Sequence, residues 1–322
     1  MCKIIVMANQ KGGVAKTSST RNLAYSLAEL GKKVLAVDFD PQTNLTISFG
    51  VAPAALQETA ASLMMKLVMD EALPEKESCI LNIGKVDLLP SKKTLTVAEV
   101  NLLIERKDDC LAKLLAPLRA DYDYILVDTG PSLGSLTINA FTAADEIIIP
   151  VDPELFALVG LKELTETISK IKQNLNPKVE IIGILFTKCS KRTTLYRQTS
   201  EQVRSVFGHL PIFESQIPAT VQVGTANSKG LSVMELDAKS PAAAAYMEFG
   251  KGGACVCLTS IPVSVLWTTF WGLRGRWRTR RQRRTSLPSL EITKFKCFRQ
   301  RSSVVSGDTP SGCMRATDLM TW

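Results

Sequence analysis

A glycine-rich turn near the N-terminus constrains the fold of this chain more than any other stretch. An apolar run at residues 4–8 predicts a buried strand, and the pair Gly12 and Gly13 follows it closely. Beyond Thr17, leucines recur at helical spacing as far as Gly31, which indicates a helix. A strand, a glycine turn and a helix N-terminus gather free backbone N–H groups at the positive end of the helix dipole. The stretch therefore predicts a binding site for phosphate groups.

The lysines of this turn distinguish it from the common phosphate-binding loop. The pattern G-x-x-x-x-G-K-[ST] does not match, because Gln10 and Ala15 stand at its two glycine positions. The variant with an additional lysine, K-G-G-x-x-K-[ST], matches in full at Lys11, Gly12, Gly13, Lys16 and Thr17. A lysine and a hydroxyl at a helix N-terminus suit a triphosphate and its magnesium ion. We expect the loop to contact the nucleotide through Lys11, Gly12, Gly13, Val14, Ala15, Lys16, Thr17 and Ser18.

One carboxylate ends a later apolar run and completes the predicted magnesium site. Asp128 follows residues 124–127, which are expected to form a buried strand. In open α/β sheets, ligands bind outside the carboxyl ends of the strands, where Asp128 and the glycine turn should meet. Magnesium prefers an octahedral oxygen shell rich in water. We predict Thr17 as a direct ligand and Asp128 as a carboxylate that holds the ion through water.

Two further carboxylates, Asp38 and Asp40, follow the apolar run at residues 34–37. Residues two apart on an extended chain point the same way, so both should face the same site. Phosphoryl transfer depends mainly on positioning and charge, so a carboxylate that orients water is sufficient chemistry. We expect Asp40 to orient the attacking water. Asp38 is expected to hold magnesium or support a loop, and a purely structural role for it stays open.

The order of the other elements predicts the fold class. Apolar runs predict strands at residues 34–37, 86–90, 124–128, 146–151 and 179–186. Helical patterns cover residues 53–70, 97–106, 110–118, 154–174 and 242–249, a basic helix reaches Arg204, and a loop is expected from 218 to 230. Strands that alternate with helices, and are apolar almost throughout, indicate an α/β fold of three layers. Its sheet should be twisted, mostly parallel and covered by helices on both faces.

A change of composition near residue 250 predicts the domain organisation. The net charge is +8, yet residues 251–322 alone carry 13 Lys and Arg against three Asp and Glu. All four tryptophans also lie there, and the pair Gly252 and Gly253 is expected to interrupt the last helix. We predict an ATPase domain at residues 1–250 and an atypical tail at 251–322. The tail is interpreted as out-of-frame translation or a fusion remnant, with an arginine-rich nucleic-acid arm as the alternative.

Composition also bears on compartment and partners. No N-terminal signal peptide and no run of about 20 apolar residues occurs, so we expect a cytoplasmic protein without a membrane span. The eight cysteines lack repeated metal-ligand spacing, which favours free thiols. The basic stretch from Lys188 to Arg204 is either a solvated helix face or a surface for DNA phosphates.

At these motifs the sequence resembles the ParA family of deviant Walker A ATPases, which includes Soj and is related to MinD. The resemblance runs from residue 3 to about 249 and is carried by residues 9–17, 37–42, 125–128, 217–221 and 237–246. It implies that Lys11 crosses an ATP-bound homodimer to the partner's phosphates and that Lys16 binds the phosphates of its own subunit. It also implies that Thr17 binds Mg²⁺, that Asp40 is needed for hydrolysis, and that Pro218 lies near the adenine.

The resemblance further implies a role in moving DNA. Members dimerise on ATP, bind DNA non-specifically as that dimer, and release it when a ParB-type partner stimulates hydrolysis, which segregates plasmids or chromosomes. Three departures stand out: Ala15 replaces a glycine, Gly130 alters the turn after Asp128, and residues 219–222 lack the arginines that many relatives carry there. DNA affinity would then depend on a local patch, such as Lys188 to Arg204 with Lys229 and Lys239.

Two other functions of the same ATPase class remain as alternatives. A MinD-like, membrane-associated regulator of cell division would need a C-terminal amphipathic helix, and none is evident before residue 250. An ATP-dependent carrier of metal clusters would need well-placed bridging cysteines. Liposome binding and bound iron would identify these alternatives.

Overall fold

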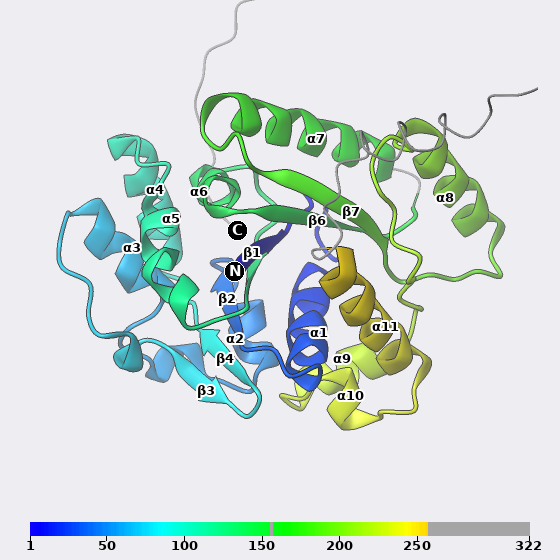
Figure 1. The fold of residues 1–322 in the computed structure, drawn as a ribbon, viewed down its shortest axis with the longest axis horizontal. Coiled ribbons are helices and arrows are strands. Elements are labelled where there is room, and N and C mark those ends of the chain that lie inside the picture. The colour runs from blue at the N-terminus through cyan, green and yellow to red at the C-terminus, as the bar shows by residue number, and fades with distance from the viewer. Residues whose placement is uncertain (155–156, 257–322) are drawn as a thin grey trace, which may run out of the picture. The chain divides into compact units, whose positions relative to one another are not determined.

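A central seven-stranded sheet organises the protein in this computed structural model, which describes residues 1–154 and 157–256. The strands lie in the order β3-β4-β2-β5-β1-β6-β7 (Figure 1). Their bounds are β1 Lys3–Met7, β2 Val34–Phe39, β3 Leu81–Ile83, β4 Val86–Leu89, β5 Tyr124–Thr129, β6 Glu146–Val151 and β7 Glu180–Phe186. Every neighbouring pair is parallel except β3 and β4. The predicted α/β class with a mostly parallel sheet is confirmed.

Helices cover both faces of this sheet (Figure 1). The α-helices are α1 Lys16–Glu29, α2 Asn44–Ser48, α3 Ala60–Val68, α4 Leu95–Glu105, α5 Cys110–Leu115, α6 Ser135–Ala143, α7 Ala157–Asn174, α8 Thr194–Val206, α9 Val221–Ser228, α10 Val233–Leu236 and α11 Pro241–Val256. Short 3₁₀ turns are η1 Pro53–Ala55, η2 Lys76–Ser78 and η3 Pro117–Ala120. Buried residues of α1, α2, α10 and α11 pack on one face, and those of α3 to α8 pack on the other. No helix among the described residues is long and apolar enough to cross a bilayer.

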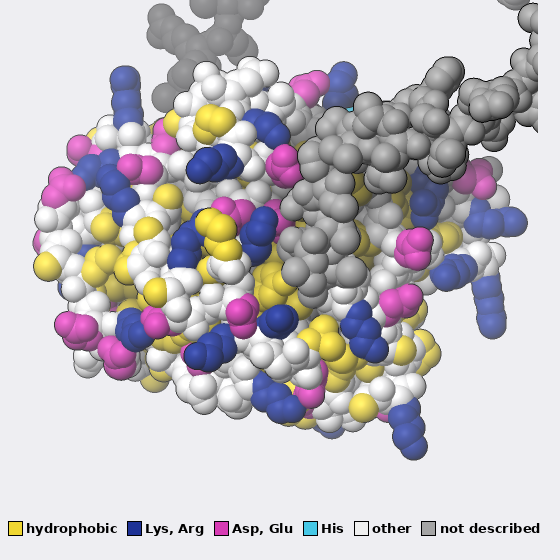
Figure 2. Space-filling view, in the orientation of Figure 1, with side chains coloured by type: hydrophobic (Ala, Val, Ile, Leu, Met, Phe, Trp, Pro, Cys, Tyr) yellow, Lys and Arg dark blue, Asp and Glu magenta, His cyan; other side chains and the backbone are white. Residues whose placement is uncertain are grey.

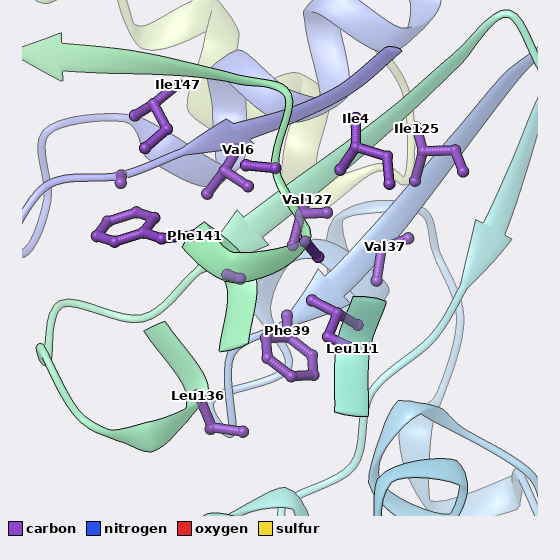
Figure 3. Packing of buried hydrophobic residues seen from close by; sticks show 14 of the residues in the cluster. Ile4, Val6, Val37, Phe39, Leu111, Ile125, Val127, Leu136, Phe141 and Ile147 are labelled. Carbon is purple, nitrogen blue, oxygen red and sulfur yellow. The ribbon is translucent and has the colours of Figure 1, made fainter. Parts of the chain in front are cut away.

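Alternation along β1 explains how one strand serves two cores. Ile4 and Val6 belong to the cluster under α3 to α8, whereas Ile5 and Met7 belong to the cluster under α1 and α11. All four side chains are at most 2% exposed. Figure 3 shows the first cluster, in which Ile4 and Val6 lie among residues from neighbouring strands and helices. A strand buried on both faces has no polar positions, which is why the run is apolar throughout.

Several predicted boundaries were wrong. The sequence pattern did not reveal the edge strand β3, since Asn82 is exposed there and its two neighbours are only partly buried. The helix expected at residues 53–70 is a 3₁₀ turn followed by α3, and the loop expected after Pro218 contains α9. α11 continues through Gly252 and Gly253 to Val256. Other expectations for the tail lie outside the described residues.

Candidate nucleotide-binding site

The register of the central strands brings the predicted residues to one edge of the sheet. Asp128 of β5 pairs with Asp38 of β2 on one side and with Met7 of β1 on the other. The chain leaves β1 at Met7 and forms the glycine loop before α1 begins at Lys16. The strand ends therefore place the loop, Asp38 and Asp128 next to one another, as predicted from their positions after apolar runs.

The glycine loop has the open shape that phosphate groups require. Gly13 has φ +74°, and a Cβ added at Gly12 or Gly13 would meet no heavy atom within 4 Å. Ala15 precedes α1 with φ 63° and ψ 31°, a left-handed conformation that alanine rarely adopts. Nζ of Lys16 donates to the carbonyls of Asn9 at 2.8 Å and Lys11 at 3.2 Å. Burial lowers the pKa of Lys16, with Asp128 and Asp40 acting in the opposite direction.

Two residues that sequence reasoning did not select anchor this loop. Nδ2 of Asn9 donates to the carbonyl of Pro150 at 2.7 Å, and Oδ1 of Asn9 accepts from the backbone N–H of Lys11. The hydroxyl of Thr187 donates to the carbonyl of Val14 at 3.0 Å. The loop is thus tied to the ends of β6 and β7. Asn9 lies within the matched motif and Thr187 directly follows a predicted strand. Their positions in the sequence could therefore have indicated that both lie near the site.

Thr17 and Asp128 meet where the magnesium ion is predicted. The Thr17 hydroxyl donates to Oδ2 of Asp128 at 2.6 Å, and Thr20 donates to Oδ1 at 3.4 Å. Asp128 is fully buried, and this desolvation, reinforced by the charge of Asp38, raises the pKa of its carboxyl. A bound cation would remove that penalty. Hydroxyl and carboxylate oxygens are ligands that magnesium prefers, so the residues present fit the ion.

Asp38 is engaged with the following loop and helix. Its Oδ2 accepts from the backbone N–H of Thr46 at 2.8 Å and from the Thr46 hydroxyl at 2.6 Å. Oδ1 accepts from the N–H of Asp40 at 3.3 Å. Burial raises the pKa of Asp38 to about 6. These contacts agree with the expected support of a loop, and a role of Asp38 as a metal ligand stays a prediction.

Asp40 lies at the edge of the cavity, beside the turn after β5. Its Oδ1 accepts from the N–H of Gln42 at 2.9 Å. A Cβ at Gly130 would lie 3.3 Å from that same oxygen. The glycine that departs from the family pattern therefore lets the Asp40 carboxylate pack against the turn next to Asp128.

The two lysines of the motif occupy different environments. Lys16 is 7% exposed and turns into the loop. The Lys11 side chain is 34% exposed and forms an ion pair with Glu154, which follows β6. This pair lowers the pKa of Glu154. Glu154 was not selected from the sequence, where nothing but its proximity to a strand end distinguishes it.

A cavity of about 710 Å³ extends from the glycine loop. This volume suits a nucleotide. Its phosphate end is lined by Gly12, Gly13, Ala15, Lys16, Thr17, Ser18 and Asp40, and its far end by Ile217, Pro218, Thr220, Val223 and Asn227. Every residue predicted to contact the nucleotide lines this cavity except Lys11, which pairs with Glu154, and Val14, which is buried.

The fold and the site together define a P-loop nucleotide-binding protein of the deviant Walker A class. A family described as AAA domain matches residues 2–181. The chromosome partitioning protein ParA of Myxococcus xanthus is 38% identical over 250 residues, which are 77% of this chain and 87% of the relative. The sporulation initiation inhibitor protein Soj of Bacillus subtilis is 36% identical over 252 residues, which are 78% of this chain and 98% of that protein. The chain belongs to the ParA family of partitioning proteins.

A solved relative supports the ligand assignment. Cobyrinic acid a,c-diamide synthase from Mycobacterium smegmatis, with bound ADP and magnesium, is 34% identical with a TM-score of 0.67. The match covers 78% of this chain and 93% of the relative. That structure holds the kind of nucleotide and the ion that the sequence predicts here.

Proposed function

We propose that this protein binds ATP with Mg²⁺, hydrolyses it to ADP and phosphate, and uses the cycle to position or segregate DNA. The observation that carries the proposal is that two lysines of one loop differ in burial and in position relative to the cavity. Lys16 is buried and lines the phosphate end of the cavity, whereas Lys11 does not line it, is partly exposed and pairs with Glu154. A partly exposed lysine that does not line the cavity of its own subunit is available to the nucleotide of a second subunit, which would make the loop a switch for dimerisation.

The chemistry assigned to each residue follows from its position. Lys16 and the free N–H groups of the loop would hold the phosphates, and Thr17 with Asp128 would hold the ion. Bound magnesium would neutralise charge on the phosphate oxygens. Asp40 would orient a water molecule for attack, since it lines the cavity beside Gly130, in the turn that follows Asp128 and β5. Pro218 would border the base at the far end.

A basic surface supports the DNA-binding part of the proposal. Lys191, Arg192, Arg197 and Arg204 are exposed on α8 and the turn before it, where Glu201 is the one acidic residue. Figure 2 shows Lys and Arg side chains projecting from the edge of the protein that α8 occupies in Figure 1. Sequence-independent DNA binding needs only such phosphate contacts. A ParB-type protein is proposed as the partner that stimulates hydrolysis, by likeness to ParA and Soj.

The proposal is tested by comparing hydrolysis and dimerisation in the full chain. Wild type should release phosphate, and Lys16→Ala and Asp40→Ala should abolish that release. Asp40→Ala should still form an ATP-dependent dimer in light scattering, whereas Lys11→Ala should not. Hydrolysis at the wild-type rate in both Lys16→Ala and Asp40→Ala would refute the assignment.

A further inference from the structure

Asn227, near the end of α9, contacts the glycine-loop helix without a role in the site described so far. Its Nδ2 donates to Oγ of Ser18 at 3.0 Å, and both residues line the cavity. Figure 1 shows α9 beside α1, in agreement with this contact. Its Oδ1 is buried and has no hydrogen-bond partner among the described residues. A buried acceptor without a partner reduces stability, so asparagine is not explained by folding alone.

The hydrogen bond from Asn227 limits the acceptors to which the Ser18 hydroxyl can donate its own hydrogen. A hydroxyl that accepts from Asn227 must direct its own hydrogen elsewhere. In a helix the usual acceptor is the carbonyl four residues earlier, which here belongs to Val14. That carbonyl accepts from Thr187, and the described chain holds no hydrogen bond to it from Ser18. The proton of Ser18 is therefore free for a group in the cavity.

A buried arginine of α1 joins the same two segments. Arg21, one turn beyond Ser18, donates Nη2 to the carbonyl of Gly230 at 2.6 Å and is 3% exposed. Its Nε and Nη1 have no hydrogen-bond partner among the described residues, and the guanidinium lies over the Phe49 ring, 4.5 Å from its centroid. Its hydrogen bond to Gly230 joins α1 to the residues just after α9, which helps to hold Asn227 beside Ser18.

We propose that Asn227 is a positioning residue for the nucleotide, acting through Ser18 on the α-phosphate. The inference rests on the proposed binding of ATP. The terminal phosphates belong beside Lys16 and Thr17, and the base belongs beside Pro218. Ser18 faces α9 on the base side, so its hydroxyl meets the phosphate nearest the base. Because ATP and ADP share that phosphate, Asn227 strengthens the binding of both.

The isosteric variant gives the sharpest test. In Asn227→Asp, the carboxylate would accept the Ser18 proton instead of donating to its oxygen, and would add negative charge near the phosphate. We expect Asn227→Ala in the full chain to weaken the binding of fluorescent ADP and ATP analogues about tenfold. Asn227→Asp should weaken that binding more. KM for ATP should rise while kcat changes less than about twofold, since the contact is equal in ground and transition states. Thr225→Ala, on the same helix outside the cavity, should bind as wild type does.

Two further measurements separate positioning from mere folding. The melting temperature of Asn227→Ala should be unchanged or higher, because the variant removes an unpartnered acceptor. In a Ser18→Ala background, Asn227→Ala should cause no additional loss of affinity. Wild-type affinity in Asn227→Asp, or independent losses in the two variants, would overturn the inference. If wild type binds neither nucleotide, the proposed function itself fails.

Discussion

The Thr17 hydroxyl donates to Oδ2 of Asp128 at 2.6 Å, which joins the start of α1 directly to the end of β5. The same two residues are those predicted to hold magnesium, Thr17 as a direct ligand and Asp128 through water. The hydrogen bond compensates part of the cost of burying the Asp128 carboxylate, because it lowers a pKa that burial raises. The two oxygens that would hold a magnesium ion therefore already lie close together.

Removal of that hydroxyl should impair magnesium use. We expect Thr17→Ala to lower magnesium affinity or turnover about 10- to 100-fold, a range typical of residues that support a metal. Thr17→Ser keeps the hydroxyl and should retain most activity. Phosphate release measured across a magnesium titration checks this. An unchanged magnesium requirement in Thr17→Ala would show that the hydroxyl is no ligand.

The ion pair between Lys11 and Glu154 predicts a specific titration. Lys11 lowers the pKa of Glu154 below its ordinary value of 4.5, so the pair stabilises the fold above that pH and loses its effect as the pH falls through the lowered pKa. Lys11→Ala should return the pKa toward 4.5, as followed by NMR. The free energy involved is at most about 1 kcal/mol, because both side chains are partly exposed.

A matched control lies on α7. Lys162→Ala removes the exposed partner of Glu166 and should leave Glu154 unaffected. If Lys11 crosses to a second subunit, ATP-dependent dimerisation should also raise the pKa of Glu154. A Glu154 carboxyl that titrates identically in wild type and Lys11→Ala would contradict the observed pairing.

The residues of the site that could be predicted from the sequence are those whose position follows from the order of strands and helices along the chain. Lys16, Thr17 and Asp128 follow apolar strands or open a helix, and parallel strands deliver such residues to one edge. The sheet class followed from the same alternation. Asp38 was assigned two possible roles because spacing alone cannot show that Thr46 occupies one of its oxygens.

Contacts between segments that are far apart in the chain could not be predicted from the sequence. Glu154 contacts Lys11, which is 143 residues away in the sequence, and Asn227 contacts Ser18, which is 209 residues away. No periodicity encodes such a pairing. α9 was missed because its eight residues contain only two valines and one alanine among glycine and polar residues, and β3 because it is a short edge strand.

Ala15 should make the loop less stable than glycine would. Its φ of 63° is left-handed, where a Cβ costs about 1–2 kcal/mol. Glycine removes that cost but increases the entropy of the unfolded chain. We expect Ala15→Gly to raise the free energy of unfolding by up to about 1 kcal/mol in chemical denaturation.

The opposite sign is expected within α1. Ala28→Gly, in a right-handed helical position, should lower the free energy of unfolding by about 0.5–1 kcal/mol. If both variants destabilise the protein equally, the conformation of Ala15 carries no strain, and the departure from glycine has no energetic consequence.

The last prediction concerns DNA binding by the basic surface at α8. Each phosphate contact contributes about 0.9 to the slope of log affinity against log salt concentration. Replacing Arg192 and Arg197 by alanine in the full chain should therefore reduce that slope by about 2 and weaken ATP-dependent DNA binding. Replacement of Lys170 and Lys172, exposed on α7, should leave the slope unchanged. Binding without ATP that survives the α8 substitutions would instead implicate the seven arginines at residues 274–284. DNA binding would then be separate from the nucleotide cycle.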